Sequence, residues 1–260
     1  VKLLIAGIVP ALVITALLML QIAVIARVRK LPRDTVVPSA GAIARKFAIS
    51  LPALLAPLLL IGGLMSGYFG PTEVAGVTVA YALFIGTFIY RTLTVRALWT
   101  ALRDTVEATA SVLFIVASAA LFAWVLTLDR VPVAASDFLL GLSDNPLVLL
   151  FLVNIMLLVV GMILESIAAI LIIAPIVAPA LTAAGVDPLQ LGIVFVLNLM
   201  IGLLTPPVGM SLYMVSIIAK MPLHTVIRGA APFLLPLFLS LVVVSAVPAV
   251  ATWLPNLILQ

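Results

Sequence analysis

A break inside an apolar stretch is the first place in this sequence where chemistry is expected. Residues 201–210 read IGLLTPPVGM and separate two apolar segments, 191–204 and 208–219, each about half as long as a membrane span. Proline has no N–H group and ends a helix, so the first segment is left with free carbonyl groups and the second with free N–H groups. Such carbonyls suit Na⁺, and N–H groups at the positive end of a helix suit a carboxylate.

The spacing within the break predicts a cation site. Gly202, Thr205 and Val208 are three residues apart, so that loop carbonyls and the Thr205 hydroxyl can face one ion. Pro206 and Pro207 add no competing N–H group. A proline kink that serves packing alone is the alternative, and irregular backbone at membrane depth must in either case be buried or line a cavity.

Glu165 is the one acid inside an apolar stretch, and two interpretations of it stay open. Intramembrane acids are costly and usually functional, whereas a turn glutamate at the interface is ordinary.

Asn154 and Asn198 are expected to form interhelical hydrogen bonds rather than to bind a ligand. Glu73 is expected in the first turn of a helix, where it favours the dipole, and His224 on the surface. The residues proposed to face a substrate are Glu165, Ser166, Pro206, Pro207 and Gly209.

Composition identifies the class of protein. Of 260 residues, 65% are hydrophobic and 8% are charged, with a mean hydropathy of +1.43. A soluble domain carries about 25% charged residues, so this surface must face lipid. Repeated apolar runs indicate an all-α polytopic membrane protein, and alternation typical of a β-barrel does not occur.

Several function classes are excluded by what the sequence lacks. Without cysteine there is no disulfide, thiolate nucleophile or cysteine-ligated metal. No H-E-x-x-H, G-x-S-x-G or P-loop motif is found, so the chain is not expected to be an enzyme or to bind ATP. No cofactor is expected beyond a coupling sodium ion. The net charge of +4 lies beside membrane spans, which indicates orientation rather than nucleic-acid binding.

The apolar runs and their charged borders predict the elements. Spans are expected at 3–26 (with a kink at Pro10), 47–69, 74–90, 108–128 and 230–253. Loops are expected at 27–46, 91–107, 129–146 and 220–228. Placing the three basic loops in the cytoplasm puts 11 of the 13 Lys and Arg residues inside. This assignment needs 191–219 to be one interrupted crossing of roughly 43 Å, with the break near mid-membrane.

The preceding pair of apolar segments, 147–164 and 167–181, meets at the tip GMILES (161–166). Two complete spans normally have a basic cytoplasmic turn, and this tip contains no Lys or Arg. We therefore favour a re-entrant hairpin that enters and leaves from the outer face. The hairpin would place Glu165 and Ser166 inside the membrane.

Residues 161–216, from GMILES through TPPVGM to LYMVS, resemble the large membrane subunit of tripartite ATP-independent periplasmic (TRAP) transporters. YFGPTEVAGVTVAYALFIGTFIYRTLT (68–94) and LIAGIVPALV (4–13) resemble further segments of that family. The match covers essentially the whole chain and corresponds to the C-terminal three-fifths of the subunit. Since the chain begins with valine, we expect it to be processed or a piece of something longer. One position departs from the family pattern: Gly70 stands in place of a threonine.

The resemblance implies an elevator-type secondary transporter in the bacterial inner membrane. Such a transporter takes up organic acids, of the C4-dicarboxylate or sialic-acid type, with sodium. Its implied partners are a small membrane subunit and a periplasmic substrate-binding protein. The fold has two inverted repeats, each with a hairpin and a broken helix, and the first repeat is missing here. The family's sodium site would fall on Gly161, Gly202, Thr205 and Val208.

The expected domains follow from this resemblance. Residues 1–146 would be scaffold and arm helices that include the cytoplasmic loop 27–46. Residues 147–220 would be a transport-domain repeat, with hairpin 147–183 and broken helix 191–219, and 221–260 a C-terminal transmembrane helix. Two alternatives stay open: a two-component sodium/organic-anion symporter without a binding protein, and a membrane scaffold that transports nothing.

Overall fold

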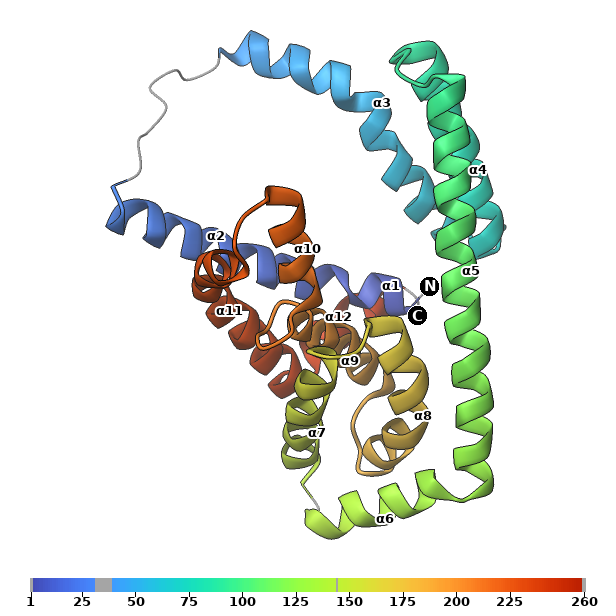
Figure 1. The fold of residues 1–260 in the computed structure, drawn as a ribbon, viewed down its shortest axis with the longest axis vertical. Coiled ribbons are helices and arrows are strands. Elements are labelled where there is room, and N and C mark those ends of the chain that lie inside the picture. Colours follow the sequence, from blue (N-terminus) through green and yellow to red (C-terminus); the bar gives the residue numbers. More distant parts are fainter. Residues whose placement is uncertain (1, 31–38, 144, 259–260) are drawn as a thin grey trace. The chain divides into compact units, whose positions relative to one another are not determined.

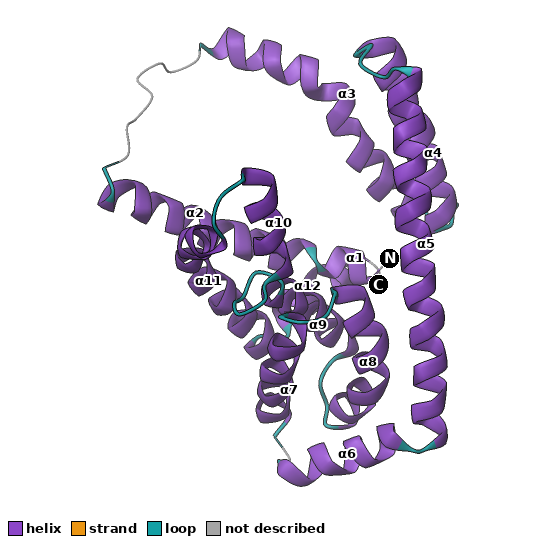
Figure 2. Ribbon diagram, in the orientation of Figure 1, coloured by secondary structure: helices purple, strands orange, loops and turns teal. Residues whose placement is uncertain are grey.

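The computed structural model describes residues 2–30, 39–143 and 145–258. Within those ranges the chain forms helices joined by turns, and no strand occurs (Figure 2). Six of the described helical segments are long and apolar enough to cross a membrane. The prediction of an all-α polytopic membrane protein is confirmed. The chain divides into two compact units, and each is considered by itself.

The first unit covers residues 31–112, of which 39–112 are described. It contains α3 (Ala40–Met65), α4 (Pro71–Phe84), the π-helical turn η1 (Ile85–Ile89) and the start of α5 (Val95–Leu128). Helix α3 packs against α4. The Tyr81 hydroxyl donates to the Pro52 carbonyl oxygen at 2.8 Å, which ties the two helices together. As predicted, Glu73 lies in the first turn of α4, and its carboxylate accepts from the Gly70 N–H at 3.0 Å.

The second unit covers residues 2–30 and 113–260. Besides the end of α5 it contains α1 (Lys2–Ala6), α2 (Ile8–Val28), α6 (Val131–Leu142), α7 (Pro146–Gly161), α8 (Ser166–Ala183), α9 (Pro188–Gly202), α10 (Met210–Ala219), α11 (Leu223–Ala246) and α12 (Ala249–Ile258) (Figure 1). Helix α9 is its centre, because it contacts α1, α7, α8, α11 and α12. Its Val194 and Leu199 side chains are fully buried.

The expected loop at 91–107 is wrong over most of its length, because α5 is continuous from Val95 to Leu128. At 1.5 Å per residue the helix is about 51 Å long, well beyond a hydrocarbon core of about 30 Å. The apolar part, 108–128, is the part that matches the core, at about 31 Å. The charged first turns continue as helix outside it, supported by an exposed Arg103–Glu107 ion pair of 2.9 Å.

The expected acidic loop at 129–146 is also wrong, since it contains helix α6. Asp129 precedes this helix, Asp137 lies within it, and Asp144 lies outside the described residues. Helix α6 packs against α8. With twelve residues, α6 is too short to span a membrane. No span-length apolar run marked it in the sequence, so the charged residues of this segment led to the prediction of a loop.

The predicted last span, 230–253, is two helices instead of one. Helix α11 ends at Ala246, and Val247 is extended, with φ −120° and ψ 91°. A residue before proline avoids the helical region, so Pro248 explains the stop. Helix α12 then begins at Ala249.

Two predicted loops are shorter than expected. Helix α3 begins at Ala40, with the Ser39 side chain accepting from the Ala42 N–H at 3.2 Å, so Arg45 and Lys46 are helical. The centre of that loop, 31–38, lies outside the described residues. Likewise α11 begins at Leu223 and includes His224 and Arg228.

The first span is interrupted one turn before its proline. Helix α1 ends at Ala6 and α2 begins at Ile8, with Gly7 between them. The ring of Pro10 would meet the carbonyl of residue i−4, which is Ala6. The missing bond separates α1 from α2, whereas Gly7 keeps helical angles of φ −72° and ψ −17°, so a bend at Pro10 stays a prediction.

Candidate functional site

The break after α9 is built by local chemistry. The Leu204 N–H donates to the Ile201 carbonyl at 3.0 Å and the Thr205 N–H to the Gly202 carbonyl at 2.9 Å, so the helix tightens as it ends. Two prolines without N–H groups follow, joined by a cis peptide bond. Gly209 then takes a left-handed conformation with φ +54°, which favours glycine, and α10 begins at Met210.

Thr205 is held in a defined orientation. Its side chain is buried, with 8% of its surface exposed, and its hydroxyl donates to the Ile201 carbonyl oxygen at 2.7 Å. A hydroxyl that donates its one hydrogen keeps two lone pairs as acceptors. The Thr205 oxygen is therefore oriented as a possible ligand for a cation.

Helix α7 also tightens in its last turn, at the hairpin tip. The N–H groups of Ile163 and Leu164 both donate to the Val160 carbonyl, at 3.0 and 2.8 Å. Helix α8 begins at Ser166, and only the four residues 162–165 separate it from the end of α7 at Gly161. The hairpin predicted at 147–183 is thus present as two helices, 146–161 and 166–183, and its re-entrant placement stays a prediction.

The structure brings the hairpin tip and the break together through two glycines. A Cβ atom added to Gly202 would lie 2.7 Å from the Gly161 carbonyl carbon, and one added to Gly161 would lie 3.1 Å from the Leu199 carbonyl oxygen. Such distances leave no room for a side chain. Backbone therefore meets backbone between positions 41 residues apart in the chain.

Helices α7 and α9 run in the same direction. Asn154 contacts Asn198, and Gly161, further along α7, contacts Gly202, further along α9. The two C-termini therefore lie side by side. Each C-terminus carries a partial negative charge from carbonyls that lack helical partners. A cation between them would be attracted by both helix ends.

The oxygen donors at this place are carbonyls and one hydroxyl. Within the described ranges, no group of three or more His, Cys, Asp or Glu side chains is arranged to hold a metal ion. Carbonyl and hydroxyl oxygens, without a carboxylate among them, suit a monovalent cation that is bound and released, as at the broken helices of transporters. The Val208 side chain is a hydrocarbon without a donor atom, so only its backbone carbonyl could contribute.

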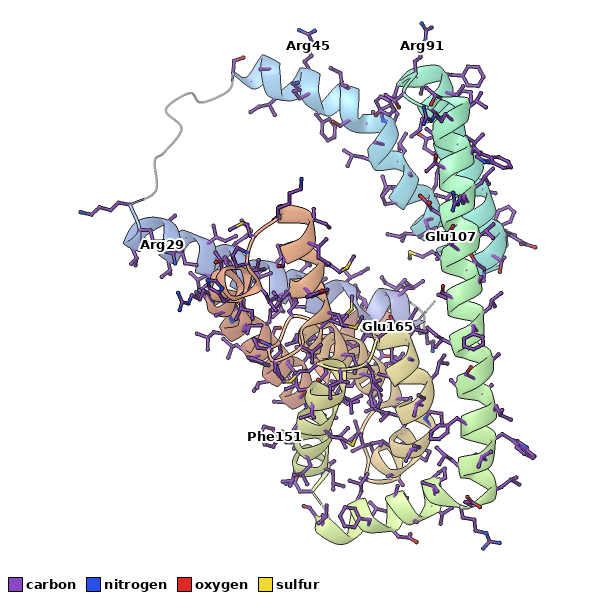
Figure 3. All side chains as sticks on the ribbon, in the orientation of Figure 1. Arg29, Arg45, Arg91, Glu107, Phe151 and Glu165 are labelled. Atoms are coloured by element: carbon purple, nitrogen blue, oxygen red, sulfur yellow. The ribbon has the colours of Figure 1, made fainter. Side chains whose placement is uncertain are left out.

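Glu165 is the N-cap of α8 (Figure 3). Its carboxylate accepts from the Ile167 N–H at 2.8 Å and from the Ala168 N–H at 3.2 Å. These bonds satisfy two of the amides that a helix start leaves unpaired. Ser166 is buried, and its hydroxyl lies 3.7 Å from the Met200 sulfur on α9.

The two helix starts of this region have different surroundings. Helix α8 packs against α6, α7 and α9, whereas α10 packs against α11. Gly209, the N-cap of α10, has no side chain to offer its amides. Pro206 and Pro207 lie between the cation side of the break and this helix start.

The expectation for Asn154 and Asn198 is confirmed. The Asn198 amide donates to the Asn154 side-chain oxygen at 2.7 Å and to the Asn154 backbone carbonyl at 2.9 Å. Asn154 in turn donates to the Ser245 hydroxyl at 2.9 Å, which links α7, α9 and α11.

Sequence reasoning missed Gln190. Its amide donates to the Val244 and Ser245 carbonyls at 3.0 and 2.8 Å, at the end of α11. The available signal was Pro248, which cannot donate to the carbonyl of residue i−4, Val244. A buried carbonyl without its helical donor needs a polar side chain nearby.

A model of the family described as tripartite ATP-independent periplasmic transporter, DctM component, matches residues 1–250. The chain belongs to the DctM family. This confirms the resemblance in the sequence, and the chain is a multi-pass protein of the bacterial inner membrane. Its DctM relatives are transporter permeases rather than enzymes.

Three DctM relatives illustrate the similarity. The sialic acid TRAP transporter large permease protein SiaM of Vibrio cholerae is 45% identical over 207 residues, covering 80% of this chain and 48% of the relative. The C4-dicarboxylate TRAP transporter large permease protein DctM of Pseudomonas aeruginosa is 41% identical over 257 residues, covering 98% and 60%. The 2,3-diketo-L-gulonate TRAP transporter large permease protein YiaN of Escherichia coli is 38% identical over 247 residues, covering 95% and 58%. The chain thus spans about half to three-fifths of the length of these relatives.

Proposed function

We propose that this chain is part of a large permease subunit that couples sodium entry to the uptake of an organic acid. One observation carries the proposal: the C-termini of α7 and α9 meet at Gly161 and Gly202 beside the buried Thr205 hydroxyl. Sodium is the proposed ion, held by backbone carbonyls near Gly161, Gly202 and Val208 and by the Thr205 oxygen. A small membrane subunit and a periplasmic binding protein are the proposed partners. Hairpin 147–183 and broken helix 191–219 would form the mobile repeat.

The proposed substrate class rests on the relatives and on helix polarity. The names of the three relatives refer to sialic acid, a C4-dicarboxylate and a gulonate, all organic acids. A carboxylate is stabilised at a helix N-terminus. The Glu165 carboxylate already accepts two of the first N–H groups of α8, whereas α10 has no side-chain cap and its Ser211 N–H donates to the Leu203 carbonyl at 3.2 Å. The start of α10, after Pro207 and Gly209, is therefore our preferred carboxylate position.

This arrangement explains how one break can couple two solutes. The end of α9 attracts a cation and the start of α10 attracts an anion, and the seven residues 203–209 separate them. Either charge would stabilise the other across this short segment. Binding of each solute is then expected to raise the affinity for the other by the same factor.

Replacement of Thr205 tests the cation site. In the complete transporter, Thr205→Ala removes the hydroxyl ligand and is expected to raise the sodium concentration for half-maximal uptake about tenfold or more. Thr205→Ser keeps the hydroxyl and is expected to stay near the native value. Thr182→Ala is the matched control, because the Thr182 hydroxyl makes the same bond, to the Ala178 carbonyl at 2.8 Å, in α8.

Unchanged sodium dependence in Thr205→Ala, at normal expression, would remove Thr205 as a ligand. Uptake that needs no added periplasmic protein would instead favour a two-component sodium/organic-anion symporter. If native protein showed neither uptake nor any effect of sodium on stability, the transport proposal would fail and a scaffold would remain. The three outcomes are separated by the same proteoliposome assay, with and without sodium and binding protein.

A further inference from the structure

A pair of amides lies deep in the interface between α7 and α9. Asn198 is fully buried and Asn154 is 6% exposed. Their neighbours Val153, Leu157 and Leu199 are also buried, so the pair lies in an apolar interior. An amide in such surroundings is stable only with a hydrogen-bonding partner.

The bonds of this pair depend on the register of the two helices. Asn198 donates to both oxygens of Asn154, and the donors of Asn154 reach Ser245 on α11. A slip of α7 along α9 would break these bonds and leave several buried polar groups unpaired. It would also bring side chains against the backbone contact of Gly161 with Gly202.

The hydrogen bonding of the pair is incomplete. The Asn198 side-chain oxygen has no hydrogen-bond partner among the described residues. Leucine is usual at buried positions, and replacing a buried polar group with a well-packed apolar one is often neutral or stabilising. A single buried asparagine is known to specify helix register at a cost in stability. The incomplete bonding therefore points to a role in register rather than in stability.

We propose that Asn154 and Asn198 are positioning residues that hold the C-termini of α7 and α9 level, so that their carbonyls face one cation. The inference rests on the proposed sodium coupling. Asn198 lies one helical turn before Gly202, and Asn154 lies two turns before Gly161. Neither side chain needs to touch the ion.

Uptake by the complete transporter tests the function of the pair. Asn198→Leu and Asn154→Leu are each expected to raise the sodium concentration for half-maximal uptake about fivefold or more. The maximal rate at saturating sodium should stay within about twofold, because the ligands themselves are intact. For the sodium dependence, the double variant should be no worse than either single variant, since both remove the side-chain bond between Asn154 and Asn198. Ser240→Ala is the matched control: Ser240 is fully buried, and its hydroxyl bonds only within α11, to Leu237.

A distance measurement tests the effect of the pair on helix register separately from sodium coupling. The chain has no cysteine of its own, so spin labels can be placed at Val159→Cys on α7 and Val196→Cys on α9, both exposed. Without sodium, the label distance should be narrow in the native background and should shift or broaden in Asn198→Leu, but not in Ser240→Ala. A narrow, unshifted distance in Asn198→Leu overturns the inference. So does an altered distance with unchanged sodium dependence. Native uptake that ignores sodium, with an altered distance in Asn198→Leu, would overturn the proposed function and leave the pair only a structural role.

Discussion

The Thr205 hydroxyl donates to the Ile201 carbonyl, and the Glu165 carboxylate accepts two backbone N–H groups. These hydrogen bonds leave the two residues with different capacities to bind a solute. Thr205 keeps free lone pairs beside two helix ends, so it can bind a cation. Glu165 uses one carboxylate oxygen, Oε2, for both bonds that cap α8, so its position in the structure favours a capping role.

Substitution of Glu165 separates capping from charge. Glu165→Gln keeps a side-chain oxygen that can accept from Ile167 and Ala168, and we expect stability and uptake near native values. Glu165→Leu removes the cap and should lower the free energy of unfolding by about 1 kcal/mol. Thermal unfolding in detergent and uptake in proteoliposomes measure these effects.

Asp187 provides the control, since its carboxylate caps α9 by the same geometry, accepting from Leu189 and Gln190 at 2.8 and 3.1 Å. If Glu165→Gln abolished uptake while Asp187→Asn did not, the negative charge of Glu165 would be required. Capping would then not account for it.

In helix α11, side chains of neighbouring helices replace hydrogen-bond donors that are missing because of prolines. Pro236 cannot donate to the Pro232 carbonyl, and Pro248 cannot donate to the Val244 carbonyl. Glutamines from other helices supply the missing donors: Gln21 of α2 bonds Pro232 at 3.2 Å, and Gln190 of α9 bonds Val244 at 3.0 Å. Pro236 and Pro248 thus tie α11 to α2 and α9, because the Pro232 and Val244 carbonyls accept from glutamine side chains of those helices.

Removal of these glutamines should destabilise the protein unequally. Gln190→Leu leaves the Val244 and Ser245 carbonyls unpaired and is expected to lower the free energy of unfolding by about 1–3 kcal/mol per buried group. Gln21→Leu leaves one partly buried carbonyl and should cost less. In a Pro236→Ala background the helix regains its own N–H donor, so Gln21→Leu should become almost neutral. Equal losses from Gln21→Leu with and without Pro236 would show that the glutamine does not replace the missing donor.

The depth of the hairpin tip in the membrane is a property of the whole molecule. Helix α7 has 16 residues and is about 24 Å long, less than a hydrocarbon core of about 30 Å. The tip 162–165 carries no Lys or Arg. Both features favour a hairpin that stops within the membrane, with Gly161 at the depth where the break of α9 and α10 lies.

Labelling at the tip tests that depth. Ile163 is exposed in the structure, and Ile163→Cys introduces a thiol into a chain without cysteine. A re-entrant tip should react slowly with a membrane-impermeant maleimide added from either side of inside-out or right-side-out vesicles. Ala183→Cys, at the exposed end of α8, should react readily from the outer face. Rapid labelling of Ile163→Cys from the cytoplasmic side alone would instead establish two complete spans.

The sequence by itself determined the features that depend on local chemistry. Two prolines without N–H groups had to end α9, and the apolar runs had to become membrane helices. The resemblance to the family was also readable, and the residues proposed to bind sodium followed from it and from the break. Charge was a weaker guide: the segments 91–107 and 129–146 were read as loops, because charge reports contact with water and not the absence of a helix.

Only the tertiary structure decided which of these local features meet. The contact of Gly161 with Gly202 joins positions 41 residues apart, and Gln190 reaches a carbonyl 54 residues away. A glycine in an apolar run can pack against many different neighbours. The sequence also does not show to which carbonyl a glutamine side chain will donate. Those pairings arise when α7, α9 and α11 pack side by side, because a buried carbonyl that is left unpaired is costly. The same packing places two helix C-termini together, which turns a broken helix into a candidate cation site.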